Sequence, residues 1–341
     1  MRVLVTGGTG AVGREAVKRL VAHGHIVTVI GRTPDLTIEG ATYRQCDIVD
    51  FECLTDCVQG MDGIVHLAAI PNPSMGTSEA IFYVNDTGTF NVYCAAAAAG
   101  IRRIVSASSI NALGYNFGIK RFPLQYFPMD EAHPRYTTDP YSFSKQIMEE
   151  IGAYFWRREG VSSVFLRLPG VYEVTEENEE RMQEWRTRTM ASYQELLSKP
   201  EEEQRRAAQE IIAQHDRLRE ERAFEMHGDT ARADHWRKMR ELPYARMMFG
   251  YSNFWASIDA RDSAQAIEQG LLADYEGSHP LWVNDSHNSA GVPTEALAAL
   301  FYPDVPLTRP IPGTESLVSI DKARSLLGFE PEYSVSRWYP G

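Results

Sequence analysis

The first half of the chain alternates short apolar runs with longer segments in which apolar residues recur at helical spacing. Residues 3–5 and 26–30 are nearly all apolar, which is typical of parallel strands covered on both faces. Residues 14–22 have the helical spacing, and Gly24 ends this segment. By the same criteria we expect strands at residues 41–45, 63–68, 103–106 and 163–168, and helices at residues 51–58, 78–100 and 140–159. This order predicts an α/β fold with a doubly wound parallel sheet.

The composition changes after Tyr172, where a long segment rich in Glu, Arg, Gln and Ala begins. Between residues 176 and 242 we expect two or three charged helices. One is predicted to start at Ser198, as a capping serine before Pro200, and Gly228-Asp229 indicates a further break. The apolar residues of this segment form only a partial stripe: Leu196, Leu197, Ile211, Ile212 and Leu218. The pattern is typical of a solvated helical insertion packed on the body, and a lid or an oligomer contact is the alternative.

The last part of the chain returns to a mixed pattern. We expect strands at residues 254–258 and 280–284, and helices at residues 261–272, 293–301 and 321–327.

The composition sets the class of the protein. The 341 residues are 43% hydrophobic and 23% charged, as in a folded domain with a sizeable core. A net charge of -12 without a basic patch argues against nucleic acid as a partner. The four cysteines contain no C-x-x-C pair, so we expect neither disulfides nor a metal site. Because no signal peptide or membrane span is evident, we expect a cytoplasmic protein.

The clearest local motif is the glycine run from Thr6 to Gly13, between the first strand and the first helix. Gly7 permits the tight turn, Gly10 lets the backbone approach a pyrophosphate, and Gly13 lets helix and strand pack closely. The start of the helix then directs free N–H groups at the anion. The motif predicts a nicotinamide dinucleotide site in a Rossmann domain.

The end of the second strand bears on the choice of cofactor. An acidic residue there would bind the adenosine ribose, but the sequence has Gly31-Arg32-Thr33. Arg32 can hold a 2′-phosphate with its planar guanidinium, so the sequence favours NADP. Asp35 lies close enough to keep NAD as the alternative.

A tyrosine and a lysine stand four residues apart at Tyr141 and Lys145, on one face of the helix at residues 140–159. A free tyrosine, with a pKa near 10, is a weak base at neutral pH. A nearby ammonium and an oxidised nicotinamide favour the phenolate, which can take a proton from a carbinol as hydride leaves. Serines at residues 106–109 can donate a hydrogen bond to the reacting oxygen.

Together these residues resemble the extended short-chain dehydrogenase/reductases, in the NAD(P)-dependent epimerase/dehydratase family. The resemblance runs from Met1 to about Tyr172 and returns weakly around residues 257–272. It implies Ser109, Tyr141 and Lys145 as catalytic residues. It also implies cofactor contacts from Gly7, Thr9, Gly10, Ala11, Val12, Gly13, Arg32, Asp47, Ile48, Leu67, Ala68, Ala69, Asn85, Tyr141, Lys145, Pro169 and Val171. Such a family implies a sugar-like small-molecule substrate and a homodimer.

The chain departs from the family at the substrate side. Sugar-nucleotide dehydratases usually carry Thr-Asp-Glu where this chain has Ser109-Ile110-Asn111, so we do not expect dehydration. The long insertion replaces part of the usual substrate region. By position, four residues are candidates for substrate contacts: His133, Arg167, Tyr172 and Trp255.

Three functions are compatible with this resemblance. A sugar-nucleotide epimerase ranks slightly first, followed by an NADP-dependent dehydrogenase or reductase of a free sugar, uronate or other carbonyl compound. A dinucleotide sensor without turnover is third, because the tyrosine and lysine are both present.

We assign residues 1–172 to the dinucleotide-binding domain and 173–252 to a charged helical insertion on the substrate side. Residues 253–341 are expected to contribute to both regions.

Overall fold

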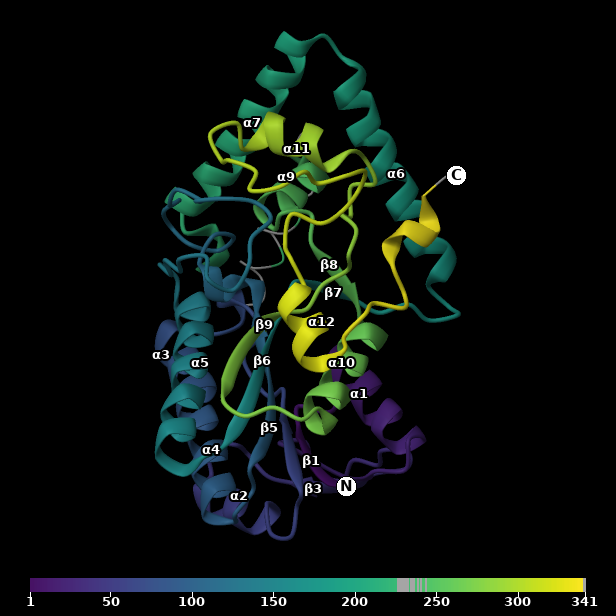
Figure 1. Ribbon diagram of the computed structural model, residues 1–341. Coiled ribbons are helices and arrows are strands. Elements are labelled where there is room, and N and C mark those ends of the chain that lie inside the picture. The colour runs from purple at the N-terminus through teal and green to yellow at the C-terminus, as the bar shows by residue number, and fades with distance from the viewer. Residues whose placement is uncertain (226–232, 234–236, 238, 240, 243, 340–341) are drawn as a thin grey trace.

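The computed structural model describes residues 1–225, 233, 237, 239, 241–242 and 244–339 of the chain. A parallel sheet of seven strands lies at its centre, in the order β3-β2-β1-β4-β5-β6-β9 (Figure 1). The strands are β1 (Arg2–Thr6), β2 (Ile26–Gly31), β3 (Thr42–Gln45), β4 (Gly63–His66), β5 (Arg103–Ser109), β6 (Ser162–Leu168) and β9 (Ser278–Trp282). The order turns back between β1 and β4, which confirms the doubly wound α/β fold.

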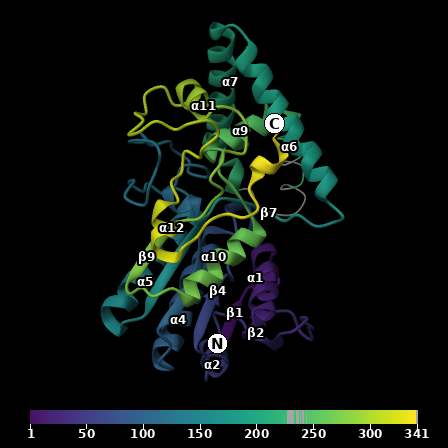
Figure 2. The same cartoon turned by 45° about the vertical axis from the view of Figure 1, so that its right-hand side comes forward.

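Helices cover both faces of this sheet. The α-helices are α1 (Ala11–Ala22), α2 (Phe51–Cys57), α3 (Ser78–Ile81), α4 (Gly88–Ala98), α5 (Pro140–Glu159), α6 (Glu179–Ser198), α7 (Glu201–Glu220), α9 (Ala245–Ser252), α10 (Ala260–Leu272), α11 (Thr294–Phe301) and α12 (Asp321–Leu327). Figures 1 and 2 show α1, α10 and α12 on one face and α2, α4 and α5 on the other. Successive residues of β1 serve the two layers, because Val3 and Val5 pack with α1 and α10 while Leu4 packs with α2 and α4.

The single helix expected at residues 78–100 is instead three segments. A π-helical segment, η2 (Phe82–Thr87), separates α3 from α4. Within it the Asn85 side chain bonds both backbone groups of Ile70, at 2.7 Å and 3.1 Å. This side chain holds the loop after β4 from within a widened turn, a local feature that the apolar spacing does not reveal.

The insertion folds into α6 and α7, which form the tapering end of the molecule at the top of Figures 1 and 2. The predicted serine cap is wrong: Ser198 ends α6, and its hydroxyl bonds back to the Glu195 carbonyl oxygen. Pro200 instead precedes α7, without a side-chain cap. The expected break at Gly228-Asp229 lies outside the described residues.

The apolar stripe of the insertion is buried against the body. Leu196, Ile211 and Leu218 belong to one core cluster with Leu297 and Phe301 of α11. Leu197 and Ile212 pack against this cluster as partly buried residues. The prediction that the insertion packs on the body is therefore confirmed.

The strand expected at residues 254–258 begins later. Phe254 and Trp255 have positive φ angles of 56° and 52°, which break an extended chain, and both side chains are buried. The strand β8 (Ser257–Asp259) follows them and pairs in parallel with β7 (Gly170–Tyr172), outside the main sheet.

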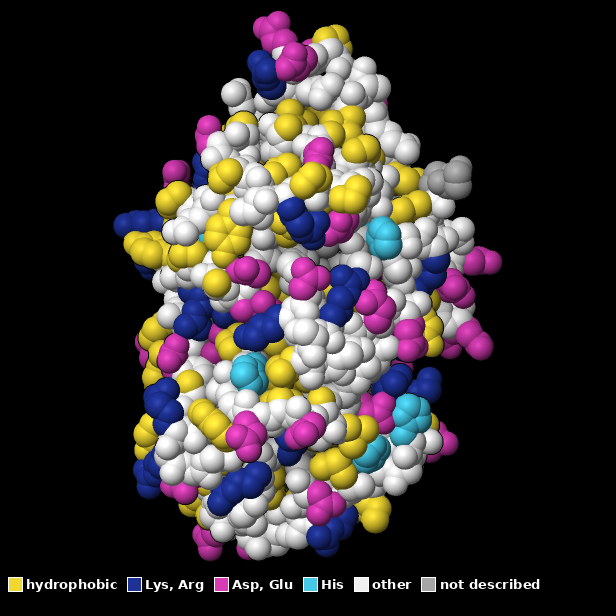
Figure 3. All heavy atoms as spheres, in the orientation of Figure 1, with side chains coloured by type: hydrophobic (Ala, Val, Ile, Leu, Met, Phe, Trp, Pro, Cys, Tyr) yellow, Lys and Arg dark blue, Asp and Glu magenta, His cyan; other side chains and the backbone are white. Residues whose placement is uncertain are grey.

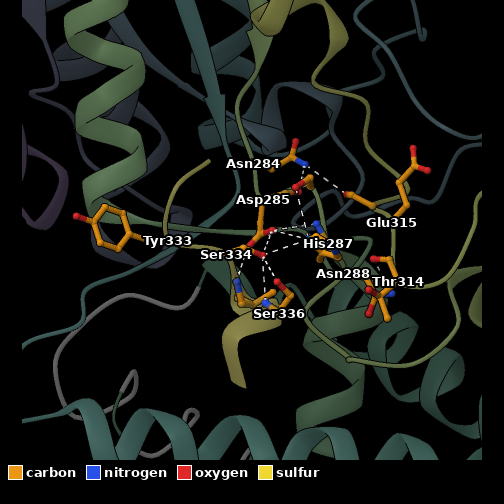
Figure 4. A network of polar contacts seen from close by, with 12 residues as sticks. Asn284, Asp285, His287, Asn288, Thr314, Glu315, Tyr333, Ser334 and Ser336 are labelled. Carbon is orange, nitrogen blue, oxygen red and sulfur yellow. Dashed lines mark hydrogen bonds and ion pairs between the residues drawn. The ribbon is translucent and has the colours of Figure 1, made fainter. Parts of the chain in front are cut away.

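A buried carboxylate fastens the C-terminal segment to the body, as Figure 4 shows. Asp285 follows β9 and accepts hydrogen bonds from the Ser334 hydroxyl at 2.8 Å and from the Val335 N–H at 2.6 Å. Ser334 also caps the short 3-10 helix η5 (Val335–Trp338), which contacts α6. The network thereby brings Trp338 to the insertion.

On the face shown in Figure 3, Lys and Arg side chains are interspersed with Asp and Glu rather than gathered in one basic patch. Among the helices that the structure describes, none combines the length and apolar character needed to cross a bilayer.

Candidate active site

The turn between β1 and α1 leaves no room for side chains at two glycines. Gly7 has a φ of 71°, and a Cβ there would lie 2.7 Å from the backbone nitrogen of Ala68. A Cβ at Gly13 would lie 2.3 Å from the carbonyl oxygen of Gly7. The close packing predicted for Gly13 is therefore confirmed.

The first turn of α1 is open toward a cavity. The helix begins after Gly10, which gives no side-chain cap, and a Cβ at Gly10 would meet only the Gly7 carbonyl oxygen, at 3.6 Å. Uncapped N–H groups and the helix dipole attract an anion at this position. The turn therefore fits the pyrophosphate of a dinucleotide.

A cavity of about 700 Å³, here called the cofactor cavity, runs along the carboxyl ends of the central strands. Ser109 lines it, as do nearly all the predicted cofactor residues: Gly7, Thr9, Gly10, Ala11, Val12, Gly13, Arg32, Asp47, Ile48, Leu67, Ala68, Ala69, Tyr141, Lys145, Pro169 and Val171. Asn85 is the exception: it does not line the cavity, because its side chain is buried behind it and braces Ile70 and the Ser144 hydroxyl.

Arg32 lies at the end of the cavity formed by β2 and β3. It is exposed and has no ion pair with any residue that the structure describes. Asp47 lies near it and accepts the Val49 N–H at 3.2 Å. A free guanidinium at this end fits a phosphate on the adenosine ribose.

A buried histidine at the end of β4 supports the backbone beside the cavity. His66 lies between the hydroxyls of Thr6 and Thr89, at 2.9 Å and 3.0 Å, and burial lowers its pKa to about 3. The Thr6 hydroxyl also accepts the N–H groups of Leu67 and Ala68. The neutral imidazole therefore helps to fix the turn that the glycines contact.

Helix α5 presents Tyr141 and Lys145 to the cavity. Asp139 caps the helix by accepting the Ser142 N–H at 2.9 Å, and Pro140 occupies its first turn. The Lys145 Nζ donates to the Ala107 carbonyl oxygen at 2.8 Å and lies 5.8 Å from the centre of the Tyr141 ring. Two further N–H bonds of the ammonium are left for a bound molecule.

Burial controls the protonation of this pair. Burial raises the pKa of Tyr141 to about 12, although a hydrogen bond from Ser109 acts in the opposite direction and lowers this pKa. Burial lowers the pKa of Lys145 to about 8. The phenolate expected from the sequence therefore needs more positive charge than the protein alone supplies, whereas the neutral phenol is ready to donate a proton.

Ser109 ends β5 and faces the same space. Its oxygen accepts the backbone N–H of Asn111 at 3.1 Å and the Asn111 side-chain amide at 3.2 Å. Because both lone pairs are engaged, the hydroxyl hydrogen remains available for Tyr141 or for a reacting oxygen.

A buried acid without hydrogen bonds lies close to Lys145. Asp86 belongs to η2, and neither of its carboxylate oxygens has a partner among the described residues. Burial raises its pKa to about 7, and the charge of Lys145 opposes this shift. Asp86 in turn favours the ammonium of Lys145.

Two of the four proposed substrate residues have other roles. Arg167 is buried and binds both carboxylate oxygens of Glu149, at 2.9 Å and 2.8 Å, and His133 accepts the Gln125 N–H. Neither residue lines the cofactor cavity or the second cavity described next. Their chain positions suggested the site, but their side chains point into the protein.

The second cavity, of about 760 Å³, shares the lining residue Val171 with the cofactor cavity. Tyr172 and Trp255 line it, as proposed. Arg186 of α6, which could not be predicted from the sequence, also lines it; Arg186 is 5% exposed and has no carboxylate partner among the described residues. Its guanidinium lies instead 4.7 Å from the ring centre of Tyr172 and 5.0 Å from that of Trp185.

The insertion also approaches Tyr141. The ring of Phe117 lies 6.0 Å from that of Tyr141, and the ring of Phe224 lies 5.5 Å from Phe117. Phe224 belongs to η4 (Ala223–Glu225), directly after α7. The end of the insertion thus packs close to Tyr141 through Phe117.

Comparisons with known proteins agree with this geometry. The model of the NAD dependent epimerase/dehydratase family matches residues 3–207. The L-arabinose 1-dehydrogenase (NAD(P)(+)) of Haloferax volcanii is 35% identical over 54% of this chain and 72% of its own length. The uronate dehydrogenase of Pseudomonas putida is 27% identical over 49% of this chain and 60% of its own.

The fold is also that of solved relatives. A short-chain dehydrogenase/reductase superfamily protein from Agrobacterium tumefaciens, solved with bound NAD, has a TM-score of 0.63 and 22% identity. The match covers 99% of this chain and 94% of the other. The expected resemblance is confirmed: the chain belongs to the NAD dependent epimerase/dehydratase family, as an NAD(P)-dependent epimerase or oxidoreductase.

Proposed function

We propose that this protein is an NADP-dependent dehydrogenase of a sugar that carries an acidic group. The observation that carries the proposal is that the two cavities share Val171 in their linings. One cavity holds Tyr141 and Lys145, and the other holds Arg186, a buried cation without an anionic partner among the described residues. The names of the two relatives above, dehydrogenases of a sugar and of a uronate, support the same class of reaction.

The residues of the chain divide the proton chemistry among them. In oxidation, the Tyr141 phenolate accepts the carbinol proton; in reduction, the neutral phenol returns it to the carbonyl oxygen. Ser109 donates its free hydrogen to that oxygen, and Lys145 holds the nicotinamide ribose. The bound dinucleotide supplies the hydride acceptor or donor, and its positive ring in the oxidised state adds to Lys145 in favouring the phenolate.

The preference for NADP rests on Arg32. Its unpaired guanidinium lies where β2 ends, beside the cavity, and no carboxylate follows that strand directly. NAD remains the alternative because Asp35 is nearby in the chain, although its side chain is exposed and its φ of 53° belongs to a turn.

The assignment of an acidic group to the substrate rests on Arg186. A cation removed from water loses several kcal/mol of solvation unless an anion or hydrogen bonds replace the water. The faces of aromatic rings replace only part of this solvation energy, about 2 kcal/mol for a desolvated cation. A carboxylate or phosphate on the substrate would complete the pairing with a charge-assisted hydrogen bond.

The proposal is tested by comparing a uronate with the neutral aldose of the same configuration, with NADP and then NAD. We expect the wild type to favour the uronate in kcat/KM by about 10- to 100-fold, equivalent to one charged hydrogen bond. Arg186→Met should lose this preference mainly through KM. Arg188→Met, on the exposed side of α6, is the control. Equal activity on both sugars in the wild type would refute the acidic-group assignment.

A sugar-nucleotide epimerase is the second candidate, and the size of the second cavity favours it. With about 760 Å³ and aromatic side chains such as Trp185 and Phe249, the cavity has room for a nucleotide. Stoichiometry separates the two reactions. A dehydrogenase changes the nicotinamide absorbance in proportion to substrate consumed, whereas an epimerase converts substrate without net change in the cofactor.

We also propose a homodimer through the outer surface of α4 and α5. Exposed rings gather there: Phe82 stacks on Phe143, and Phe90 stacks on Tyr154. Exposed aromatic clusters of this kind mark protein interfaces. Light scattering of the wild type should give twice the chain mass, and Phe90→Asp should give the chain mass itself.

A further inference from the structure

Three of the four cysteines gather beside the end of the cofactor cavity where Arg32 and Asp47 lie. Cys46 follows β3 and lines the cavity, whereas Cys53 and Cys57 lie one turn apart on α2. The three Sγ atoms all lie within 4.8 Å of one another. The chain spacing gave no reason to expect a metal here, because Cys46 joins the helical pair only through the fold.

The spacing of the sulfurs is close to that of a thiolate metal site. With zinc–sulfur bonds of about 2.3 Å, the sulfurs of a tetrahedral or trigonal site lie about 3.8–4.0 Å apart. Contraction from 4.8 Å needs movements of less than about 1 Å, which rotation of cysteine side chains can supply. Three sulfur ligands favour a soft or borderline cation over magnesium or calcium.

The surroundings leave the sulfurs free to bind. Apart from contacts with one another, the thiols make only weak hydrogen bonds to the described residues, from Cys46 to the Asp47 carbonyl oxygen at 3.6 Å and from Cys53 to that of Gln45 at 3.7 Å. Cys53 is half-buried and gives a path from solvent. The Arg44 guanidinium donates to the Asp56 carbonyl oxygen at 3.3 Å, one residue before Cys57, so a positive charge lies beside the cluster.

We propose that Cys46, Cys53 and Cys57 bind one thiophilic divalent cation of the zinc class. The three thiols release three protons to solvent, three metal–sulfur bonds form, and a water completes the coordination. Three thiolates and a divalent ion leave one negative charge, which Arg44 offsets. This site goes beyond the proposed function, because it uses none of the residues that carry out hydride transfer.

The experiment titrates the reduced full-length protein with Cd²⁺ alone, as a spectroscopic substitute for Zn²⁺. We expect one Cd²⁺ per chain, a sulfur-to-cadmium charge-transfer band in the ultraviolet, and a higher Tm with metal than without. Cys53→Ser, at the half-buried position, should lose the band and bind Cd²⁺ at least about 100-fold more weakly. Cys94→Ser, which removes the cysteine of α4, is the matched control and should behave as the wild type.

Two results would overturn the proposal. One is a wild type with no charge-transfer band at one equivalent of Cd²⁺. The other is a band that survives in Cys53→Ser or disappears equally in Cys94→Ser. The wild-type titration needs no variant to fold, and circular dichroism of each variant shows whether its loss of binding comes from unfolding.

Discussion

The two cavities that share Val171 in their linings are built in different ways. The cofactor cavity is formed largely by backbone, glycine and small residues at the ends of β1, β2 and β4. The second cavity is formed by long side chains, including Trp185 and Arg186, on α6, α9 and β7. A backbone surface binds a group that stays constant, such as a phosphate, whereas long side chains can be exchanged without moving the chain. Under the proposed function, this difference assigns cofactor recognition to the first cavity and substrate identity to the second.

The largest expected effect lies in the cofactor cavity, at Tyr141. Tyr141→Phe removes the proton carrier and keeps the ring that packs against Phe117. We expect kcat to fall by about 10²- to 10⁴-fold, with the dissociation constant of NADP unchanged. Steady-state kinetics and a cofactor titration check the two parts.

Tyr136→Phe is the control for this change. Tyr136 is exposed, so the substitution removes the same hydroxyl group at a position away from the cavity. Undiminished activity in Tyr141→Phe would show that the catalytic assignment is wrong. If the wild type binds cofactor but turns over no sugar, the protein is a dinucleotide sensor.

The next largest effects test the glycine turn of the cofactor cavity at two positions, Gly13 and Gly10. The Cβ of Gly13→Ala would meet the backbone of Gly7 and Gly8 at 2.3 Å and 2.6 Å, and backbone cannot easily move away. We expect it to lower the free energy of unfolding by about 1–3 kcal/mol and to weaken cofactor binding strongly. The Cβ of Gly10→Ala meets only one atom, at 3.6 Å. It should leave the free energy of unfolding within about 0.5 kcal/mol and weaken only cofactor binding.

Chemical denaturation and cofactor titration of both variants distinguish these outcomes. If Gly10→Ala binds cofactor as the wild type does, the pyrophosphate does not pass over Gly10. The comparison of the two cavities would then lose its main support.

The same contrast explains what could be predicted from the sequence. The glycine turn, the strands and the Tyr141–Lys145 pair are local, because each follows from residues within a few positions of one another. Asp139-Pro140 marks the start of α5 by capping chemistry alone, and the structure begins that helix at Pro140. The parts that we propose to bind the cofactor were therefore predictable with nearly correct bounds.

The second cavity depends on contacts between distant segments. Arg186 stands in a run of Glu and Arg that predicts a solvated helix, and only the fold brings Tyr172 and Trp338 to its guanidinium. The third thiol of the cysteine cluster, Cys46, joins α2 in the same way. The left-handed residues Phe254 and Trp255 likewise carry no turn signature, since their conformation is fixed by burial in the core.

A smaller effect is expected at the far end of the cofactor cavity. Arg32→Ala should weaken NADP by about tenfold, or ~1.4 kcal/mol, and leave NAD nearly unchanged. Arg102→Ala, another exposed arginine, is the control. Equal loss for the two cofactors would show that Arg32 does not recognise the 2′-phosphate.

The smallest expected effect concerns a charge behind the wall of the cofactor cavity. Asp86 is buried without hydrogen bonds to described residues, and its charge favours the ammonium of Lys145, whose pKa burial lowers to about 8. Asp86→Asn removes that charge, so the pKa of Lys145 should fall further. If the ammonium supports hydride transfer, the alkaline limb of the kcat/KM profile should move to lower pH. Glu150→Gln, an exposed change on α5, should leave the profile in place.

Stability gives an independent readout of the same charge. Because burial raises the pKa of Asp86 from about 4 to about 7, the folded protein keeps a proton that the unfolded chain releases between these values. The wild type therefore loses stability as the pH rises from about 4 to about 7, whereas Asp86→Asn lacks this loss. The difference in unfolding free energy between them should grow across that window and level off above it. A constant difference would mean that Asp86 is not buried as a titrating acid, and a shifted kcat/KM profile would then need another cause.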